Sequence, residues 1–380
     1  ATYHLQYDSP LTSNVAAHAK ISSSWVRASE SADDLAVAGA EAVQASMQGA
    51  GRIATFIAPA NHAWEEASQP ALPLPQPGPL QVEAETVKGV AELLANGKTT
   101  GLLLGGRALR EQCLFAAGQI AKASGARILC ETFPARLQRG AGRVKVGRLP
   151  YFPEQVEEYL EPFEQLILVG TKPPVSFFAY PGKKSWLTPE SCSIETLASV
   201  DHDIFAALEA LRMEIGADAE PDLAAEPPAT PAPSGELNPV AIGHSVAALL
   251  PENAIVSDEA NTCGMGIFPF TEHAPRHDWL TLTGGAIGIG LPLSLGAAIA
   301  CPDRKVLALQ ADGSAMYTVQ ALWTMARENA DVTVVIMNNR SYAILNIELA
   351  RVGARQPTGK TLSMLDLSRP DINWLEVSEG

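Results

Sequence analysis

The sequence has few cysteines, no C-x-x-C spacing and none of the common hydrolase or P-loop motifs. Its cysteines are scattered and odd in number: Cys113, Cys130, Cys192, Cys263 and Cys301. Such thiols argue against a disulfide framework or a zinc site and favour a reducing cytoplasm. Because G-x-S-x-G, H-E-x-x-H and G-x-x-x-x-G-K-[ST] are missing, esterase, zinc-protease and P-loop functions lack support.

Positive charge and long apolar runs are also scarce. The net charge is −15, and no block rich in lysine or arginine occurs, so nucleic acid is not an expected partner. No apolar run approaches the roughly 18 to 20 residues that cross a membrane. The first twenty residues lack both the basic segment and the apolar core of a signal peptide. We therefore expect a cytoplasmic protein that binds no membrane.

The composition is that of a globular chain, with 47% hydrophobic and 18% charged residues, and its length of 380 residues suits two or three domains. Two proline-rich stretches, 69–82 and 216–239, cannot hold regular helices or central strands and are predicted linkers. They divide the chain into segments 1–68, 83–215 and 240–380. Each segment alternates predicted strands and helices, which favours an α/β fold with parallel sheets flanked by helices.

The first and last segments contain too few elements to complete such sheets. In the first, Asp33–Met47 is an expected helix and Ile53–Ile57 an expected strand. One helix and one strand cannot cover both faces of a parallel sheet, so we expect this domain to be incomplete. In the last, Trp374–Val377 is predicted to be a strand that further elements should follow, so its C-terminal end is expected to be incomplete too.

The middle segment resembles a nucleotide-binding unit only superficially. Gly101–Leu104 is a predicted buried strand, Gly105 and Gly106 form a turn, and a helix is expected over Leu109–Ser124. The full G-x-G-x-x-G pattern is absent, and no acidic residue stands convincingly where a ribose would bind. A connecting domain without a ligand is the favoured interpretation.

Polar residues that follow two strands of the last segment form the most informative pattern. The apolar strand Val306–Gln310 leads to Asp312, a helix is expected over Tyr317–Asn329, and the strand Val332–Met337 leads to Asn339. In a parallel sheet both ends lie at the edge where ligands bind. Carboxylate, amide and carbonyl oxygens suit magnesium, which usually keeps part of its shell for phosphate oxygens.

Small residues beside Asp312 would let a phosphate group approach the backbone. Gly313 and Ser314 open a helix, and the N–H groups at a helix start favour anions. The two motifs together therefore indicate a site for magnesium and a diphosphate. Asp-Gly and Asn-Asn are also common turn formers, so two ordinary turns are the alternative.

At this point the sequence resembles a known family. Asp312-Gly313-Ser314 followed by Asn338-Asn339 is similar to the thiamine diphosphate (ThDP) fingerprint of the acetolactate synthase and benzoylformate decarboxylase family, except that Ala311 replaces the usual glycine. The resemblance implies that Asp312 and Asn339 bind Mg²⁺ through their side chains and Ser341 through its backbone carbonyl.

The resemblance also implies further cofactor contacts. Asn261 and Tyr342 would border the diphosphate together with Gly313 and Ser314. The Gly285 carbonyl would face the aminopyrimidine ring, and Ile287 would be the apolar wedge that bends the cofactor. A polar turn at Asn261 and simple packing of Ile287 and Tyr342 are the alternatives.

Residues 1–68 are similar to the second half of the family's pyrimidine-binding domain, on the basis of Tyr7–Leu11, Trp25–Arg27 and Ala32–Asp34. The first half would precede Ala1, and with it the glutamate that activates the cofactor. We therefore expect a fragment, in which no catalytic residue other than the wedge Ile287 can be assigned.

The resemblance implies a ThDP- and Mg²⁺-dependent 2-oxo-acid decarboxylase or carboligase of the acetolactate synthase type, acting as a homodimer or homotetramer. The stretch Gly170–Gly182 is more similar to the flavin-free benzoylformate decarboxylases, so FAD is not expected. A non-ligating 2-oxo-acid decarboxylase and a non-catalytic ThDP-binding subunit are the alternatives. The sequence does not identify the 2-oxo acid.

Overall fold

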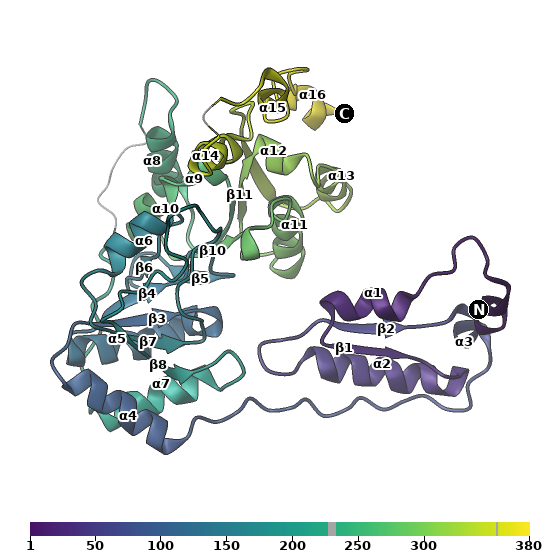
Figure 1. Cartoon of the computed structure of the whole chain (residues 1–380), viewed down its shortest axis with the longest axis horizontal. Helices are drawn as coiled ribbons and strands as arrows, with labels where there is room; N and C mark the ends of the chain where they lie inside the picture. Colours follow the sequence, from purple (N-terminus) through teal and green to yellow (C-terminus); the bar gives the residue numbers. More distant parts are fainter. Residues whose placement is uncertain (227–232, 355) are drawn as a thin grey trace.

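The computed structural model describes residues 1–226, 233–354 and 356–380. Within them the strands form three sheets, which are almost entirely parallel and are covered by helices (Figure 1). This arrangement confirms the α/β fold with parallel sheets. Of the predicted linker 216–239, residues 227–232 lie outside the described part of the chain.

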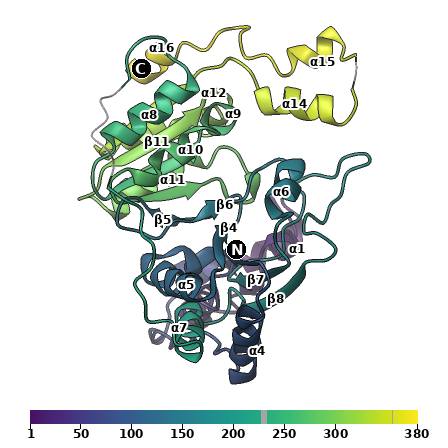
Figure 2. The same ribbon diagram turned by 90° about the vertical axis from the view of Figure 1, so that its left-hand side faces the viewer.

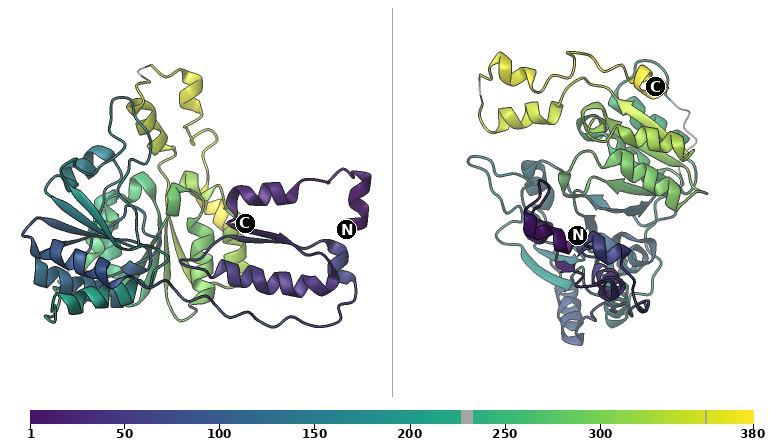
Figure 3. Two further views of the ribbon diagram at one scale, coloured as in Figure 1. Left: turned by 60° about the horizontal axis from the view of Figure 1, so that its bottom comes forward. Right: turned by 90° about the vertical axis from the view of Figure 1, so that its right-hand side faces the viewer.

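The N-terminal unit is a two-stranded parallel sheet between helices. β1 (Trp25–Ala28) and β2 (Ala54–Ile57) are joined by α2 (Ala32–Ser46), and α1 (Val15–Ser22) lies on the other side of the strands (Figures 1 and 3). Residues 66–79 form an extended connection without helix or strand, which leads to the second unit. The remaining elements of this unit are η1 (Thr2–Tyr7) and α3 (Ala60–Trp64).

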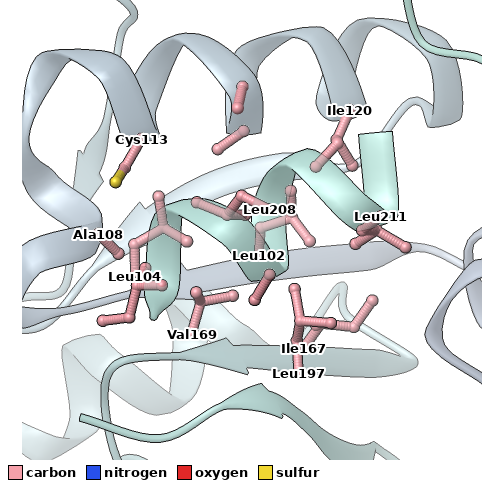
Figure 4. Close-up of a cluster of buried hydrophobic side chains, with 14 of the residues drawn as sticks. Leu102, Leu104, Ala108, Cys113, Ile120, Ile167, Val169, Leu197, Leu208 and Leu211 are labelled. Atoms are coloured by element: carbon pink, nitrogen blue, oxygen red, sulfur yellow. The ribbon is translucent and has the colours of Figure 1, made fainter. Parts of the chain in front are cut away.

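The central unit contains five parallel strands in the order β6-β4-β3-β7-β8. The middle strands are β3 (Thr100–Leu104) and β7 (Gln165–Val169), which are buried on both faces, as their continuous apolar sequences predict. Leu102 and Ile167 pack with residues of α5 and α7 in the largest core cluster (Figure 4). Its other elements are β4 (Arg127–Cys130), β6 (Gly147–Arg148), β8 (Ser193–Ala198), α4 (Ala84–Ala95), η2 (Gly106–Leu109), α5 (Glu111–Ser124), α6 (Pro153–Leu160) and α7 (Ile204–Glu214).

The C-terminal sheet has the order β12-β11-β9-β10-β5, with helices on both faces (Figure 2). One face packs against α8 (Pro239–Leu249) and α10 (Ile267–Phe270), and the other against α11 (Gly290–Ala300) and α13 (Gln320–Arg327). Its four parallel strands are β9 (Ala254–Glu259), β10 (His277–Thr281), β11 (Val306–Ala311) and β12 (Val332–Met337).

A short strand from the central segment completes this sheet. β5 (Leu137–Arg139) pairs antiparallel with β10, so residues distant in sequence share one sheet. The buried Arg139 guanidinium lies over the Phe268 ring at 3.6 Å and donates a hydrogen bond to the Phe268 carbonyl. Three residues give no visible period in the sequence, which explains why this strand was not predicted.

Two predictions at the C-terminal end need correction. Trp374–Val377 is not a strand: it belongs to α16 (Trp374–Glu379), whose first turn is capped by the side chain of Asn373. The helix expected over Tyr317–Asn329 is shorter, since α13 begins only at Gln320 after a separate turn, α12 (Asp312–Ala315). The other helices here are α14 (Ala343–Arg351) and α15 (Gly359–Ser363). Among the described residues, no helix is long and apolar enough to cross a membrane.

His277 is a buried histidine at the start of β10. Its Nδ1 donates to the Pro275 carbonyl at 2.7 Å, and its Nε2 has no partner among the described residues. Burial and the neighbouring Arg139 and Arg143 lower the pKa of His277 to about 3, although Asp278 acts in the opposite direction. The imidazole is therefore neutral in the folded chain at pH 5.

We expect His277→Phe to flatten the pH dependence of stability. In the unfolded chain a histidine titrates near its ordinary pKa, so acidification from pH 7 to 5 favours unfolding by about 2 kcal/mol for one such group. Urea unfolding at both pH values should show this loss for the original chain and a smaller loss for His277→Phe. Replacing the exposed His244 with Phe is the control. An equal loss of stability between pH 7 and pH 5 in all three chains would contradict the lowered pKa of His277.

Candidate functional site

The parallel strands of the C-terminal sheet end together at one edge. Gln310 pairs with Glu259 and Ala311 with Met337, so the segments that follow β9, β11 and β12 emerge side by side. From β9 the chain runs to β10, which lies on one side of β9. It then crosses over to β11, which lies on the other side of β9. Ligands of open α/β sheets bind at such a reversal of strand order.

Asp312 lies at the centre of this edge, directly after β11. Asp312 is buried, with only 1% of the residue exposed to solvent. One carboxylate oxygen accepts the Gly313 N–H at 2.9 Å, and the other accepts the Arg340 N–H at 2.7 Å. Burial raises the pKa of Asp312. Within the described residues no lysine or arginine side chain forms an ion pair with this carboxylate.

The turn after β12 contains the other predicted metal ligands, Asn339 and Ser341, and contacts Asp312 through the Arg340 backbone. Arg340, which contacts Asp312 through its backbone, lies between Asn339 and Ser341 and has a positive φ of 56°. The Asn339 carboxamide accepts the Ser341 N–H at 3.0 Å, and it donates to the Cys263 sulfur at 3.4 Å. The turn thus holds an amide oxygen and a backbone carbonyl beside a buried carboxylate.

Asn261 and Ser314 join the strand ends on either side of the reversal. The Asn261 amide donates to the Ser314 hydroxyl at 2.7 Å. Asn261 begins the short helix α9 (Asn261–Gly264) with a φ of 50°, a left-handed conformation that asparagine tolerates better than most residues. Two residues 53 positions apart in sequence are therefore in direct contact.

Gly313 leaves room for the Tyr342 ring. A Cβ atom at Gly313 would lie 2.5 Å from Cε1 of Tyr342, which is the N-cap residue of α14. Tyr342 itself is fixed by its N–H, which donates to the Leu365 carbonyl at 3.0 Å. The predicted residues Gly313 and Tyr342 thus pack directly on each other.

We expect Gly313→Ala to destabilise the fold by about 1–3 kcal/mol, because overpacking a close contact costs about that much. The measurement is urea unfolding, and adding Tyr342→Leu should restore part of the loss. Gly89→Ala is the control, since a Cβ there meets nothing within 4 Å and alanine favours helices. A loss at Gly313 that Tyr342→Leu leaves unchanged would contradict the contact.

A glycine-rich loop follows β10, which runs parallel to β9 and ends at the same edge of the sheet. Gly284, Gly285 and Gly288 have positive φ values, which residues with a Cβ rarely adopt. Ile287 is half-buried in this loop, and Gly285 lies against the ring of Phe177 from the central unit. The loop therefore holds the predicted wedge residue within a tightly specified backbone.

Glu259 anchors this loop and was not predicted. It is fully buried at the end of β9. Its carboxylate accepts the N–H groups of Gly288 at 2.5 Å, Ile289 at 3.2 Å and Gly290 at 2.8 Å, and the Gln310 amide at 2.7 Å. An acidic residue at the last position of a buried strand was the available signal, but only the folded chain shows its partners.

Comparison with known proteins places the chain in a class. Residues 262–379 match the family model described as "Thiamine pyrophosphate enzyme, C-terminal TPP binding domain". The C-terminal unit, with Asp312 and the turn after β12, is therefore of the ThDP-binding class.

The whole chain is similar to a Mycobacterium tuberculosis protein provisionally named acetolactate synthase large subunit IlvX, at 48% identity over 100% of this chain and 73% of the relative. It also matches a benzoylformate decarboxylase of Pseudomonas aeruginosa, at 31% identity over 38% of this chain and 28% of that protein. The chain belongs to the ThDP-dependent enzyme family of acetolactate synthases and 2-oxo-acid decarboxylases.

A solved structure shows the same fold. The ThDP-dependent 4-hydroxybenzoylformate decarboxylase of Rhodococcus jostii superposes with a TM-score of 0.82, covering 100% of this chain and 74% of that one. Sequence identity is 20%, so this likeness concerns the fold alone. It confirms the architecture expected from the family resemblance.

Proposed function

We propose that this chain acts in a Mg²⁺- and ThDP-dependent decarboxylase or carboligase of small 2-oxo acids, similar to acetolactate synthases. The observation that carries the proposal is the buried Asp312 carboxylate, whose hydrogen-bond donors among the described residues are the backbone N–H groups of Gly313 and Arg340 and which lies beside the Asn339–Ser341 turn. A buried carboxylate without a cationic partner is costly unless a cation binds it.

The residues present fit a magnesium ion. Asp312 would supply a charged oxygen, Asn339 an amide oxygen and Ser341 a backbone carbonyl oxygen. Magnesium prefers such hard ligands and shares its remaining positions with water and phosphate oxygens. Asn339 is exposed and Ser341 half-buried, which is compatible with a ligand that arrives from solution.

The surrounding residues fit a diphosphate and a bent cofactor. Asn261 and Ser314 would offer polar groups to the diphosphate, while Gly313 and Tyr342 border it. Gly285 and Ile287 would place a carbonyl and an apolar side chain against the rings.

Bound ThDP would supply the carbanion chemistry that releases CO₂ from a 2-oxo acid. This chain's own residues would bind and orient the cofactor: Asp312 would hold the metal ion that offsets the charge of the diphosphate, and Glu259 holds the loop that carries Ile287. We assign no proton-transfer role to a carboxylate of this chain.

A non-ligating decarboxylase is the second candidate. It is favoured by the similarity to the Pseudomonas aeruginosa benzoylformate decarboxylase, which covers 38% of this chain. Incubation of the assembled enzyme with pyruvate separates the two: acetolactate supports a carboligase, and aldehyde alone supports a decarboxylase.

We also propose a cytoplasmic homodimer or homotetramer that contains no FAD.

Calorimetric titration of the chain with ThDP tests the proposal. Binding is expected in the presence of Mg²⁺ and should disappear when EDTA is added. Binding that persists in EDTA would contradict the metal site. A chain that is folded by circular dichroism yet binds no ThDP at any Mg²⁺ concentration would contradict the proposed function.

A further inference from the structure

The central unit contains a cavity of about 390 Å³ at the edge of its sheet where the strands end. It opens between the segments that follow β3 and β7, where the strand order reverses. Gly106 and Gly170 line it, both with positive φ values. Its volume lies within the range of small-molecule sites.

Aromatic rings form one side of this cavity. Phe133, Tyr151 and Phe177 have ring centroids 5.7–6.0 Å apart, in tilted and edge-to-face arrangements. Such geometry is favourable for aromatic pairs, and a further flat ring can join it. Glu131 lines the cavity as well, and its carboxyl group accepts the Thr171 hydroxyl at 3.2 Å. Beside the Glu131 carboxyl group, a ligand with a neutral side chain fits better than a ligand whose side chain carries another carboxylate.

The aromatic side of the cavity contacts the glycine-rich loop and the helix α14. A Cβ at Gly285 would lie 2.2 Å from Cζ of Phe177, so the Phe177 ring packs on the glycine-rich loop. The Tyr151 hydroxyl contacts Glu348 at 3.4 Å, on the helix α14 that Tyr342 begins. The cavity therefore adjoins the loop whose Gly285 and Ile287 would face the rings of the cofactor in the proposed function.

We propose that this cavity receives the side chain of the 2-oxo acid and that it selects a flat aromatic side chain over a methyl group. This inference rests on the proposed function and deepens it by naming the class of substrate: of the two candidates, it favours the non-ligating decarboxylase over a carboligase that uses pyruvate. Phe177 is then a specificity-determining residue, because its ring stands between the cavity and Gly285.

Binding of two inert 2-hydroxy acids tests the inference. The full chain is titrated by calorimetry with mandelate, which carries a phenyl ring, and with lactate, which carries a methyl group, both with and without ThDP and Mg²⁺. Mandelate is expected to bind at least about tenfold more tightly, since burying a ring removes a large apolar area from water.

Two variants locate the effect. Phe177→Ala removes a wall of the cavity, and Val200→Phe narrows it from a side chain that is 44% exposed and lines it. Both should lower the preference for mandelate about tenfold and leave lactate binding unchanged. Phe205→Ala is the matched control, because Phe205 is 39% exposed, close to the 41% of Phe177, and lies on α7 outside the cavity.

The outcomes are distinct. Equal binding of both acids, or a preference that Phe177→Ala and Val200→Phe leave intact, would overturn the inference. Displacement of mandelate by ADP would also overturn it, since the cavity would then be a nucleotide site. A preference that depends on Phe177 in a chain that binds no ThDP would refute the proposed function and still support the cavity as an aryl-binding site.

Discussion

Replacing Asp312 with alanine is expected to weaken Mg²⁺-dependent ThDP binding by at least about 100-fold, the upper end of what is lost when a residue supporting a metal ligand is removed. Asp312 is the one charged group that we assign to the metal, and both of its oxygens lie at the end of β11. Calorimetric titration at fixed Mg²⁺ measures the effect.

Asp312→Asn separates charge from structure. Asparagine keeps the size of the side chain and one oxygen that can accept an N–H group, so this variant should fold better than Asp312→Ala yet still lose most Mg²⁺-dependent binding. Asp331→Ala, at an exposed position before β12, is the control and should bind as the original chain does. Full affinity in Asp312→Asn would refute the metal assignment.

Replacing Glu259 with alanine is expected to lower the free energy of unfolding by about 3 kcal/mol or more. The change leaves three backbone N–H groups and the Gln310 amide without their acceptor. Each buried donor that loses its partner costs about 1–3 kcal/mol, and relaxation of the loop recovers part of the sum. Urea unfolding gives the stability, and hydrogen exchange at Gly288 and Gly290 reports on the loop.

The free energy of unfolding of Glu259→Gln should lie between those of the original chain and Glu259→Ala. Its amide keeps one acceptor oxygen but turns an NH₂ group toward N–H donors. Glu92→Ala, on the exposed face of α4, is the control and should change stability by no more than about 0.5 kcal/mol. Unchanged exchange at Gly288 and Gly290 in Glu259→Ala would show that the carboxylate does not hold the loop.

Local sequence determined the central strands and much of the helical pattern. Val332–Met337 has the bounds predicted for it and Val306–Gln310 lacks only the last residue of β11, since a continuous apolar run between polar or turn residues leaves few alternatives for a buried strand. The prediction of a strand over Trp374–Val377 was wrong, because four residues are too few to distinguish a strand from a helix. The side chain of Asn373 caps the first turn and stabilises a helix there.

The tertiary structure alone decided which distant residues meet. The sequence placed Asp312 and Asn339 at strand ends, because strand periodicity and turn residues are local properties. It could not show that Arg340 donates its N–H to Asp312 or that Glu259 holds the glycine-rich loop. It also could not show that Phe177 packs on Gly285. These contacts depend on strand order and register, which are set by the packing of the whole sheet rather than by any segment of the chain.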